Sequence, residues 1–378
     1  MQPCRTLSDQ APVSRAFSRR PQAGDRIANR YVLIELLGEG GMGSVWRARC
    51  SRLDIDVAVK LVRGASAFPG SAERLRVEAL AAARVHHSAT VRVFDFGTTE
   101  HGEPYLVMEL LVGASLAELI KKRGPLPELS AVRLLLPVAG ALAAAHESGI
   151  IHRDLKPANI ILVPREDDDG CQPKLLDFGI AKIFENAPVG NPLTEQGMTL
   201  GSVGYMAPEQ VRGDLKLDPT ADVWALAVVL YELITGELPF QETRPLPYLA
   251  AILKKDPRPT TELREGDPEL WAILQRGLAR EQSKRWQSMA AFRAALAQWA
   301  LSRGAREDVS GALLECSAQP PASRSRPSAP SIPVIPGSAE VWAPASERRP
   351  TWAPLSDRRP AARISSPGDV ENITIREM

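Results

Sequence analysis

The sequence has few residues of the kinds that build metal centres, disulfide frameworks and strongly charged binding faces. Its 378 residues include four cysteines and five histidines, and neither type has the spacing of a metal site. Scattered, unpaired cysteines are typical of a reducing compartment. The formal net charge is +1, so no strong field favours nucleic acid or a membrane surface. These shortages exclude disulfide scaffolds, zinc modules and strongly basic nucleic-acid-binding proteins.

A long uninterrupted apolar run is also missing. The longest mostly apolar stretch covers residues 134–145 and is interrupted by Pro137 and Gly140. It is shorter than the roughly 20 residues that a helix needs to cross a bilayer. The amino-terminal segment carries arginines but not the apolar core of a secretory signal. We therefore expect a cytoplasmic protein without a transmembrane segment.

Composition divides the chain into three parts. Residues 1–29 are rich in Arg, Ser, Pro and Gln without periodicity, which predicts a disordered basic leader. A terminus without a role of its own is favoured over a functional arm. Residues 31–300 are patterned. Residues 301–378 are rich in Pro, Ser, Arg and Ala and contain no lysine, which predicts a disordered tail. A ten-residue repeat at 342–360, with one tryptophan near the start of each copy, is either a partner-docking motif or a duplication without a role.

The patterned part centres on the stretch from Ile150 to Ile160, which places a carboxylate, an ammonium and an amide within six residues. Asp154 can accept a proton from a hydroxyl group, Lys156 can neutralise a phosphoryl group, and Asn159 can hold a divalent metal. Apolar residues on both sides predict a tight loop held by buried strands. A second carboxylate, Asp177, begins Asp-Phe-Gly eighteen residues after Asn159. This is the residue set that phosphoryl transfer needs.

A glycine-rich turn joins two predicted strands near the start of the patterned part. The strand at 31–37 leads into Gly38-Glu39-Gly40-Gly41-Met42-Gly43, and a second strand follows at 45–48. A turn with so few side chains lets backbone N–H groups approach phosphate oxygens. Because a strand and not a helix follows the glycines, the pattern indicates a phosphate-covering loop and not a dinucleotide site.

The next strand, at 56–62, places Lys60 on its inward face, where an ammonium group needs a counter-charge. The helical pattern at 71–85 supplies it, because Glu78 lies on the inward face of that helix. Strands at 91–96 and 105–111 complete a five-stranded sheet. A planar base could insert after this sheet, against backbone groups of Glu109 and Leu111. Helices are predicted at 116–123, 130–148, 219–235, 246–253, 268–278 and 289–299.

About 30 residues without a clear period follow Asp177 and end near Glu209. Loops of this length inside a compact domain are usually functional, and this one contains Thr194, Thr199 and Ser202. Asp222 is a charge near the start of an apolar helix. It is either a helix-dipole partner or an anchor for the backbone of the loop that carries Asp154. Arg285, in a later loop, could pair with Glu209.

These motifs resemble the eukaryotic-like (Hanks-type) serine/threonine protein kinases, in the style of their bacterial members, over roughly residues 31–300. The resemblance implies an α+β, bilobal protein-kinase fold. A small N-terminal lobe, about 31–108, would hold the five-stranded antiparallel sheet and one key helix. A larger, mainly helical C-terminal lobe would cover about 112–300. It implies ATP and Mg²⁺ as cofactors and Ser/Thr hydroxyls of proteins as substrates.

The resemblance also implies roles for single residues. Asp154 would be the catalytic base, Asn159 and Asp177 would ligate Mg²⁺, and Lys156 favours serine or threonine as the acceptor. Lys60, held by Glu78, would contact the ATP phosphates. The nucleotide would also meet Leu37, Gly38, Glu39, Gly40, Gly41, Met42, Gly43, Ser44, Val45, Ala58, the gatekeeper Met108, Glu109, Leu111 and Leu162. The structural residues would be Glu209, Asp222 and Arg285.

Arg153, next to the catalytic aspartate, implies regulation of the long loop. In the family such an arginine often pairs with a phosphate there. We therefore expect autophosphorylation at Thr194 or Thr199 through a transient homodimer. Ser202, in the same loop, stands where the family usually has a threonine. A pseudokinase scaffold and a small-molecule kinase are the alternatives. The intact set of catalytic residues opposes the first, and the segment Ala207-Pro208-Glu209 opposes the second.

Overall fold

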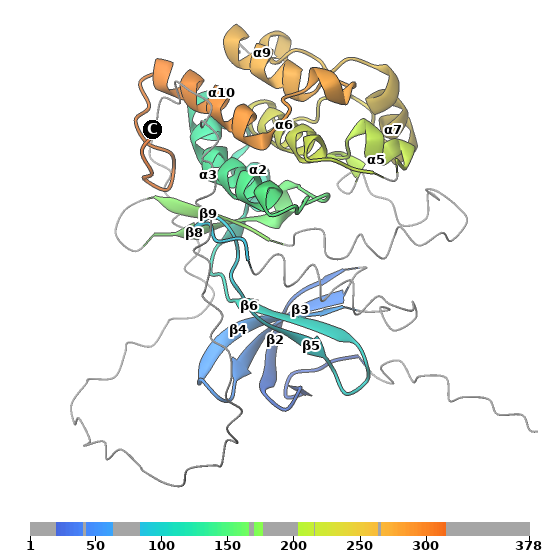
Figure 1. The fold of residues 1–378 in the computed structure, drawn as a ribbon, viewed down its shortest axis with the longest axis vertical. Helices are drawn as coiled ribbons and strands as arrows, with labels where there is room; N and C mark the ends of the chain where they lie inside the picture. Colours follow the sequence, from blue (N-terminus) through green and yellow to red (C-terminus); the bar gives the residue numbers. More distant parts are fainter. Residues whose placement is uncertain are drawn as a thin grey trace, which may run out of the picture. The chain divides into compact units, whose positions relative to one another are not determined.

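The computed structural model describes residues 20–40, 43–62, 84–165, 170–176, 203–214, 216–263 and 266–314. Six strands form one antiparallel sheet, and the helices gather with a second, three-stranded sheet (Figure 1). The strands of the first sheet are β1 (Arg26–Ile27), β2 (Tyr31–Gly40), β3 (Gly43–Cys50), β4 (Ile55–Val62), β5 (Val93–Thr98) and β6 (Pro104–Glu109), in the order β1-β2-β3-β4-β6-β5. All five predicted strands are therefore present.

The sixth strand, β1, corrects the predicted extent of the disordered leader. Ile27 pairs with Tyr31 and is 4% exposed. Ala28 and Asn29 have φ angles of 48° and 53° and turn the chain tightly between β1 and β2. Ile27 packs into the same apolar cluster as Tyr31 and Leu33. A two-residue strand in a polar segment has no periodicity, so the sequence pattern could not reveal it.

The two faces of the first sheet have different surroundings, as the alternation in β4 predicts. Val57, Val59 and Leu61 are at most 2% exposed and pack in an apolar cluster with residues of β2, β3 and β6. Ala58 pairs with Met108, and both belong to a separate cluster on the opposite face. Strand pairing and period therefore place the face with Ala58 toward the predicted nucleotide site.

The helical part is built around two long helices, α3 (Glu128–Glu147) and α6 (Thr220–Thr235), which contact each other and α10 (Figure 1). Every residue of α6 except Glu232 is buried. The other helices are α2 (Leu116–Arg123), α5 (Pro208–Arg212), α7 (Pro245–Lys254), α8 (Thr260–Leu263), α9 (Pro268–Gly277) and α10 (Met289–Ser302), with short 3₁₀ helices η2 (Pro157–Asn159) and η3 (Gln282–Lys284). The second sheet has β7 (Ala114–Ser115), β8 (Ile160–Pro164) and β9 (Cys171–Leu175).

Helix α3 continues through Pro137, and the structure supplies the missing hydrogen bond. A proline in a helix has no N–H to donate to the carbonyl four residues earlier. That carbonyl, on Arg133, accepts the backbone N–H of Val309 at 3.2 Å. Val309 is 7% exposed and lies in the segment after α10, so the domain extends beyond the predicted start of the disordered tail at residue 301.

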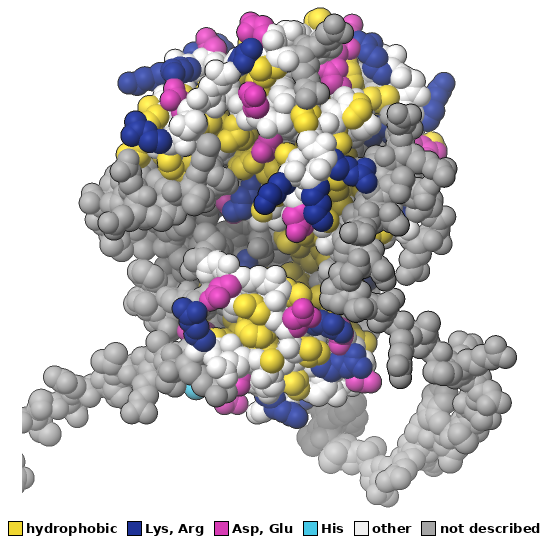
Figure 2. Space-filling view, turned by 180° about the vertical axis from the view of Figure 1, so that it is seen from behind, with side chains coloured by type: hydrophobic (Ala, Val, Ile, Leu, Met, Phe, Trp, Pro, Cys, Tyr) yellow, Lys and Arg dark blue, Asp and Glu magenta, His cyan; other side chains and the backbone are white. Residues whose placement is uncertain are grey.

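Among the described helices, α3 is long and apolar enough to cross a membrane by length and composition. Eleven of its residues are buried in the protein core, so packing against α6 and α10 accounts for this apolar character. On the face drawn in Figure 2, Lys and Arg side chains are interspersed with Asp and Glu. That mixture agrees with the near-zero net charge.

Candidate active site

The loop predicted to be catalytic is tight and fixed by buried neighbours. Leu155 is 1% exposed, and Ile160, the first residue of β8, is 0% exposed. Arg153 adopts a left-handed φ of 64°, which is uncommon for a residue with a side chain and is tolerated where the surroundings hold it. The 3₁₀ turn η2 then leads into β8.

This loop brings three predicted catalytic side chains together. Lys156 Nζ lies 2.8 Å from Asp154 Oδ2. Asn159 Nδ2 donates to the backbone carbonyl of Asp154 at 2.8 Å and to its Oδ2 at 3.3 Å. The side chains of Asp154 and Lys156 are 20% and 27% exposed, so both remain accessible to substrates. The amide nitrogen of Asn159 is used inside the loop, which leaves its amide oxygen as the atom for a metal.

Asp222, in the first turn of α6, holds the backbone before Asp154. Its carboxylate accepts the N–H of His152 at 2.8 Å and that of Arg153 at 2.9 Å, and His146 Nε2 lies 2.7 Å away. Burial alone would raise the pKa of Asp222, but these hydrogen bonds and the neighbouring histidine rings lower it below its ordinary value. The structure thus has the anchoring contact, one of the two predicted roles.

His152 itself is a packing residue. Its side chain is fully buried, and Nε2 lies 2.8 Å from the carbonyl oxygen of Leu176. That contact fixes the catalytic loop to the end of the strand that leads to Asp177.

The predicted ion pair between Glu209 and Arg285 is present and completely buried. Both side chains are 0% exposed, and two parallel hydrogen bonds of 2.7 Å join them. Arg285 Nε also donates to the carbonyl of Ala279 at 2.6 Å. Such a bidentate pair fixes direction as well as charge. One residue further, Gln210 Nε2 donates to the carbonyl of Arg153 at 2.8 Å, which joins α5 to the catalytic loop.

The glycine hairpin uses its glycines for two different reasons. Gly40 pairs with Gly43, Glu39 with Ser44, and Gly38 with Val45. A Cβ on Gly43 would lie 1.9 Å from the carbonyl oxygen of Leu61, so only glycine lets β3 approach β4 there. A Cβ on Gly38 or Gly40 would meet nothing within 4 Å, so these two leave open space beside the hairpin.

The face beyond the hairpin holds Lys60 among apolar groups. Lys60 is 8% exposed and pairs with Val45 on one side. Ala58 and Met108 are 6% and 5% exposed and form a cluster with Val45 and Leu111. These residues are the predicted apolar walls and gatekeeper of a nucleotide pocket, and the structure brings them together.

Leu162 does not belong to these walls, so its predicted contact with the nucleotide is wrong. It is 0% exposed and packs in the core of the helical part. Side chains alternate along β8, so the neighbouring Ile161 lies on the opposite face and pairs with Lys174 of β9. Lys174 contacts Glu109, the last residue of β6, which makes Ile161 the β8 residue on that side.

Glu109, the last residue of β6, turns its carboxylate into the protein. Lys174 Nζ lies 2.9 Å from Glu109 Oε1, which also accepts the N–H of Arg92 at 2.8 Å. Burial alone would raise the pKa of Glu109, but Lys174 and Arg92 lower it. Its backbone N–H donates to the carbonyl of Arg92 at 2.9 Å. The carbonyl of Glu109 and the backbone of Leu111 are therefore the groups available to an inserted base.

Several predicted site residues lie outside the described residues. They are Gly41, Met42, Glu78, Asp177, Thr194, Thr199 and Ser202. The Lys60–Glu78 pair and the second metal ligand therefore stay predictions. Within the described part of the chain, no three His, Cys, Asp or Glu side chains group as a metal site.

Three residues with roles at the site were missed from the sequence. The strand alternation of β8 could have identified Ile161, and the lysine three positions before Asp177 could have drawn attention to Lys174. No sequence signal points to Gln210, because its partner is a backbone carbonyl far away in the chain.

Comparison with known proteins agrees with this geometry. A model of the protein kinase domain matches residues 31–297. Serine/threonine-protein kinase pkn3 of Myxococcus xanthus is 39% identical over 277 residues, which cover 72% of this chain and 50% of that protein. Serine/threonine-protein kinase PknB of Mycobacterium tuberculosis is 38% identical over 275 residues, covering 71% and 43%. The chain thus spans about half the length of these curated relatives.

Solved structures give the same fold. The crystal structure of the PknI kinase domain of Mycobacterium tuberculosis superposes with a TM-score of 0.57 at 26% identity, over 74% of this chain and 99% of that one. The family match covers the glycine hairpin, the loop with Asp154 and the pair of Glu209 with Arg285. The chain therefore belongs to the protein kinase family and is of the bacterial Hanks-type serine/threonine class.

Proposed function

We propose that this protein transfers the γ-phosphate of ATP to serine or threonine hydroxyls of protein substrates. The observation that carries the proposal is the group formed by Asp154, Lys156 and Asn159. A carboxylate, an ammonium 2.8 Å away and an amide share one rigid loop and are partly accessible.

Each group has a defined task in the transfer. The substrate oxygen forms a bond to the γ-phosphorus while the bond from that phosphorus to the β,γ-bridging oxygen breaks, and Asp154 accepts the hydroxyl proton. Lys156 neutralises charge on the phosphoryl oxygens, and the glycine hairpin covers the phosphates. Asn159 and Asp177 would hold Mg²⁺, which adds positive charge when bound. Positioning and charge neutralisation supply most of the catalysis in such reactions.

The proposal is tested with purified protein, Mg²⁺, γ-labelled ATP and a generic acceptor protein. Asp154→Asn should reduce labelling to background, because a neutral amide cannot accept the hydroxyl proton. Asp54→Asn is the matched control, since its side chain is 86% exposed in a surface turn and should leave labelling unchanged. Equal labelling by Asp154→Asn and the wild-type protein would refute the assignment.

We further propose that one copy phosphorylates Thr194 or Thr199 of another, in a transient homodimer. Support comes from Arg153, whose backbone is fixed by Asp222 and Gln210 beside the catalytic aspartate. A phosphate on the loop would gain charge-assisted hydrogen bonds from its guanidinium group. Wild-type enzyme mixed with the Asp154→Asn protein should phosphorylate the inactive copy, and mass spectrometry should locate the phosphate. An inactive copy that stays unmodified at both threonines would contradict this mechanism.

A further inference from the structure

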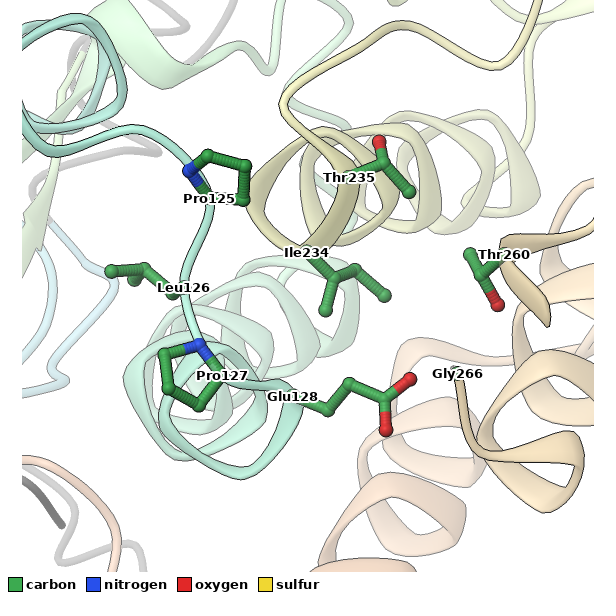
Figure 3. Close-up of a pocket in the computed structure, with 8 residues that line it drawn as sticks. All are labelled: Pro125, Leu126, Pro127, Glu128, Ile234, Thr235, Thr260 and Gly266. Atoms are coloured by element: carbon green, nitrogen blue, oxygen red, sulfur yellow. The ribbon is translucent and has the colours of Figure 1, made fainter. Parts of the chain in front are cut away.

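A cavity of about 370 Å³ lies on the helical part of the molecule (Figure 3). It shares no lining residue with the predicted catalytic and nucleotide-binding set. Its walls come from the segment that leads into α3 together with the first residue of α3, the end of α6, the start of α8, and Gly266, two residues before α9. This volume falls in the range of small-molecule sites.

The walls are held in place by backbone contacts. The N–H of Leu126 donates to the carbonyl of Leu233 at 2.7 Å, which fixes the segment before α3 against the last turn of α6. Gly236 caps α6 with a left-handed φ of 78°, and a Cβ there would lie 2.9 Å from Cγ of Pro125. The cavity is therefore preformed and does not depend on a ligand for its shape.

One buried polar group in the cavity has no partner. Thr260 is 2% exposed, and its Oγ1 makes no hydrogen bond within the described part of the chain. Buried hydroxyl groups nearly always have a partner, because losing water without one is costly. Figure 3 shows Thr260 and the carboxylate of Glu128 at the same end of the cavity, beside Gly266. A Cβ on Gly266 would lie 3.3 Å from Glu128 Oε1, so the glycine keeps this end open.

Among the described lining residues of the cavity, Glu128 is the one with a charged side chain. Glu128 accepts the N–H of Asp267 at 3.0 and 3.2 Å and makes no ion pair among the described residues. Arg303, the nearby cation, is already engaged by the carboxylate of Asp267. Burial raises the pKa of Glu128 above its ordinary value and the charge of Asp267 adds to this shift, while the hydrogen bond from the N–H of Asp267 and the charge of Arg303 oppose it. A partly desolvated carboxylate that has no ion pair within the described part of the chain favours a positively charged hydrogen-bond donor.

Apolar groups complete the lining. Figure 3 shows Ile234 pointing into the cavity between Pro127 and Thr260. Pro125 and Pro127 cover the side away from Thr260. Such walls suit a short hydrocarbon chain attached to the charged group.

We propose that this cavity binds a small alkylammonium ion. Its ammonium group donates to the carboxylate of Glu128 and the hydroxyl of Thr260, and its chain packs against Pro127 and Ile234. The same chemistry is offered by a free alkylamine and by the end of a lysine side chain.

The first experiment titrates the full chain with n-butylamine hydrochloride by calorimetry and NMR, with n-butanol as the uncharged control. Butylammonium should bind at one site, and butanol at least about tenfold more weakly, because charge-assisted hydrogen bonds exceed neutral ones. Glu128→Gln, which keeps an acceptor for Asp267, should weaken butylammonium binding about tenfold. Thr260→Val, which keeps the side-chain shape, should weaken it by about threefold or more.

Glu281→Gln is the matched control, because Glu281 is an exposed carboxylate paired only with Lys284 in a surface turn. It should leave binding unchanged. Gly266→Ala tests the shape of the cavity without removing a polar group. Its added methyl narrows the cavity and should weaken butylammonium binding. Thermal unfolding of each variant verifies that it is folded.

Comparing butylamine with Nα-acetyl-lysine amide separates the two sources of the ammonium group. Tighter binding of the lysine derivative identifies a lysine side chain as the ligand, and equal binding identifies a free amine.

Two results would overturn the proposal. One is the absence of saturation by about 100 mM butylammonium, far above the roughly millimolar affinity expected for so few contacts; the cavity would then hold water only. The other is binding that Glu128→Gln and Gly266→Ala leave unchanged. Neither result would affect the proposed phosphoryl transfer, which uses other residues.

Discussion

At the scale of single residues, the catalytic loop depends on one buried carboxylate. Asp222 is 1% exposed and directs its oxygens at the backbone N–H groups of His152 and Arg153. Without Asp222 both N–H groups would be buried donors without an acceptor. The geometry of Asp154 therefore depends on a residue that touches neither substrate.

Replacing this carboxylate should destabilise the protein and slow the reaction. Asp222→Ala leaves two buried N–H groups unpaired, so we expect a loss of about 2–5 kcal/mol in the free energy of unfolding. Asp222→Asn keeps one acceptor and should fall between the alanine variant and the wild-type protein. Urea unfolding measures the stability, and the labelling assay measures kcat. A wild-type unfolding midpoint for Asp222→Ala would contradict the anchoring role.

The same carboxylate predicts a dependence of stability on pH. The pKa of Asp222 is lower in the folded protein than its ordinary value, so the folded state binds fewer protons than the unfolded state. Its stabilising contribution is complete above the unfolded pKa of about 3.9 and is lost as pH falls through the lower folded value. The stability difference between wild type and Asp222→Asn should therefore be constant near neutrality and shrink below about pH 4. Urea unfolding across that range checks it; a difference independent of pH would contradict it.

At the scale of elements, periodic segments could be predicted from the sequence and isolated features could not. The alternation of β4 and the apolar pattern of α3 gave the correct elements because burial selects those periods. In β8 the prediction that Leu162 faces the nucleotide is wrong by one residue, because Leu162 faces the core and Ile161 lies on the opposite face. A fully apolar run such as 160–163 has no polar residue to mark its outer face, so its pattern does not distinguish Ile161 from Leu162.

Contacts between elements that are distant in the sequence also could not be predicted. The motif order predicts that Asp154, Lys156 and Asn159 lie together, since they share one loop. It does not predict that Gln210 contacts the carbonyl of Arg153, because a backbone acceptor has no sequence signature. For the same reason the sequence does not link Pro137 to Val309.

The contact between β6 and β9 predicts an effect on nucleotide binding. Lys174 joins the carboxylate of Glu109, at the end of β6, to the carbonyl of Thr90, at 2.9 and 3.3 Å. One side chain therefore holds the residue of the predicted adenine contact against β9, three residues before Asp177 in the sequence. Because a partly buried charge pair contributes about 1–2 kcal/mol, Lys174→Met should weaken nucleotide binding about five- to thirtyfold. Equilibrium titration with ADP and Mg²⁺ measures it.

Lys255→Met is the control for this variant, since Lys255 pairs with Glu242 at the surface with 64% exposure. It should bind nucleotide like the wild type. In a double-mutant cycle, Glu109→Gln should have little further effect once Lys174 is replaced. Fully additive effects would show that the two side chains act independently.

At the scale of the whole molecule, the folded domain is longer than the region that the family model matches. The match ends at residue 297, but the chain continues through α10 into a segment that packs on α3. In this segment Asp308 and Val309 are 4% and 7% exposed. The carbonyl of Glu307 accepts from Arg133 Nε at 2.7 Å, and the carbonyl of Ser310 accepts from Arg165. Residues 305–314 are therefore an integral part of the domain.

The position of this segment gives the last prediction, which couples Pro137 to Val309. A chain ending at residue 314 should unfold at the same temperature as the full chain. Ending it at residue 304 removes the N–H that the Arg133 carbonyl accepts, together with the side-chain contacts of Arg133 with Glu307 and of Arg165 with Ser310. We expect a loss of about 2–3 kcal/mol in the free energy of unfolding, equivalent to a fall in Tm of about 4–10 °C.

Pro137→Ala should recover part of this loss in the shorter chain, because the new N–H can donate to the carbonyl of Arg133. In the longer chain it should recover little, since Val309 already occupies that carbonyl. Equal Tm values for the two lengths, or equal gains from Pro137→Ala in both, would show that the segment does not replace the hydrogen bond that proline removes.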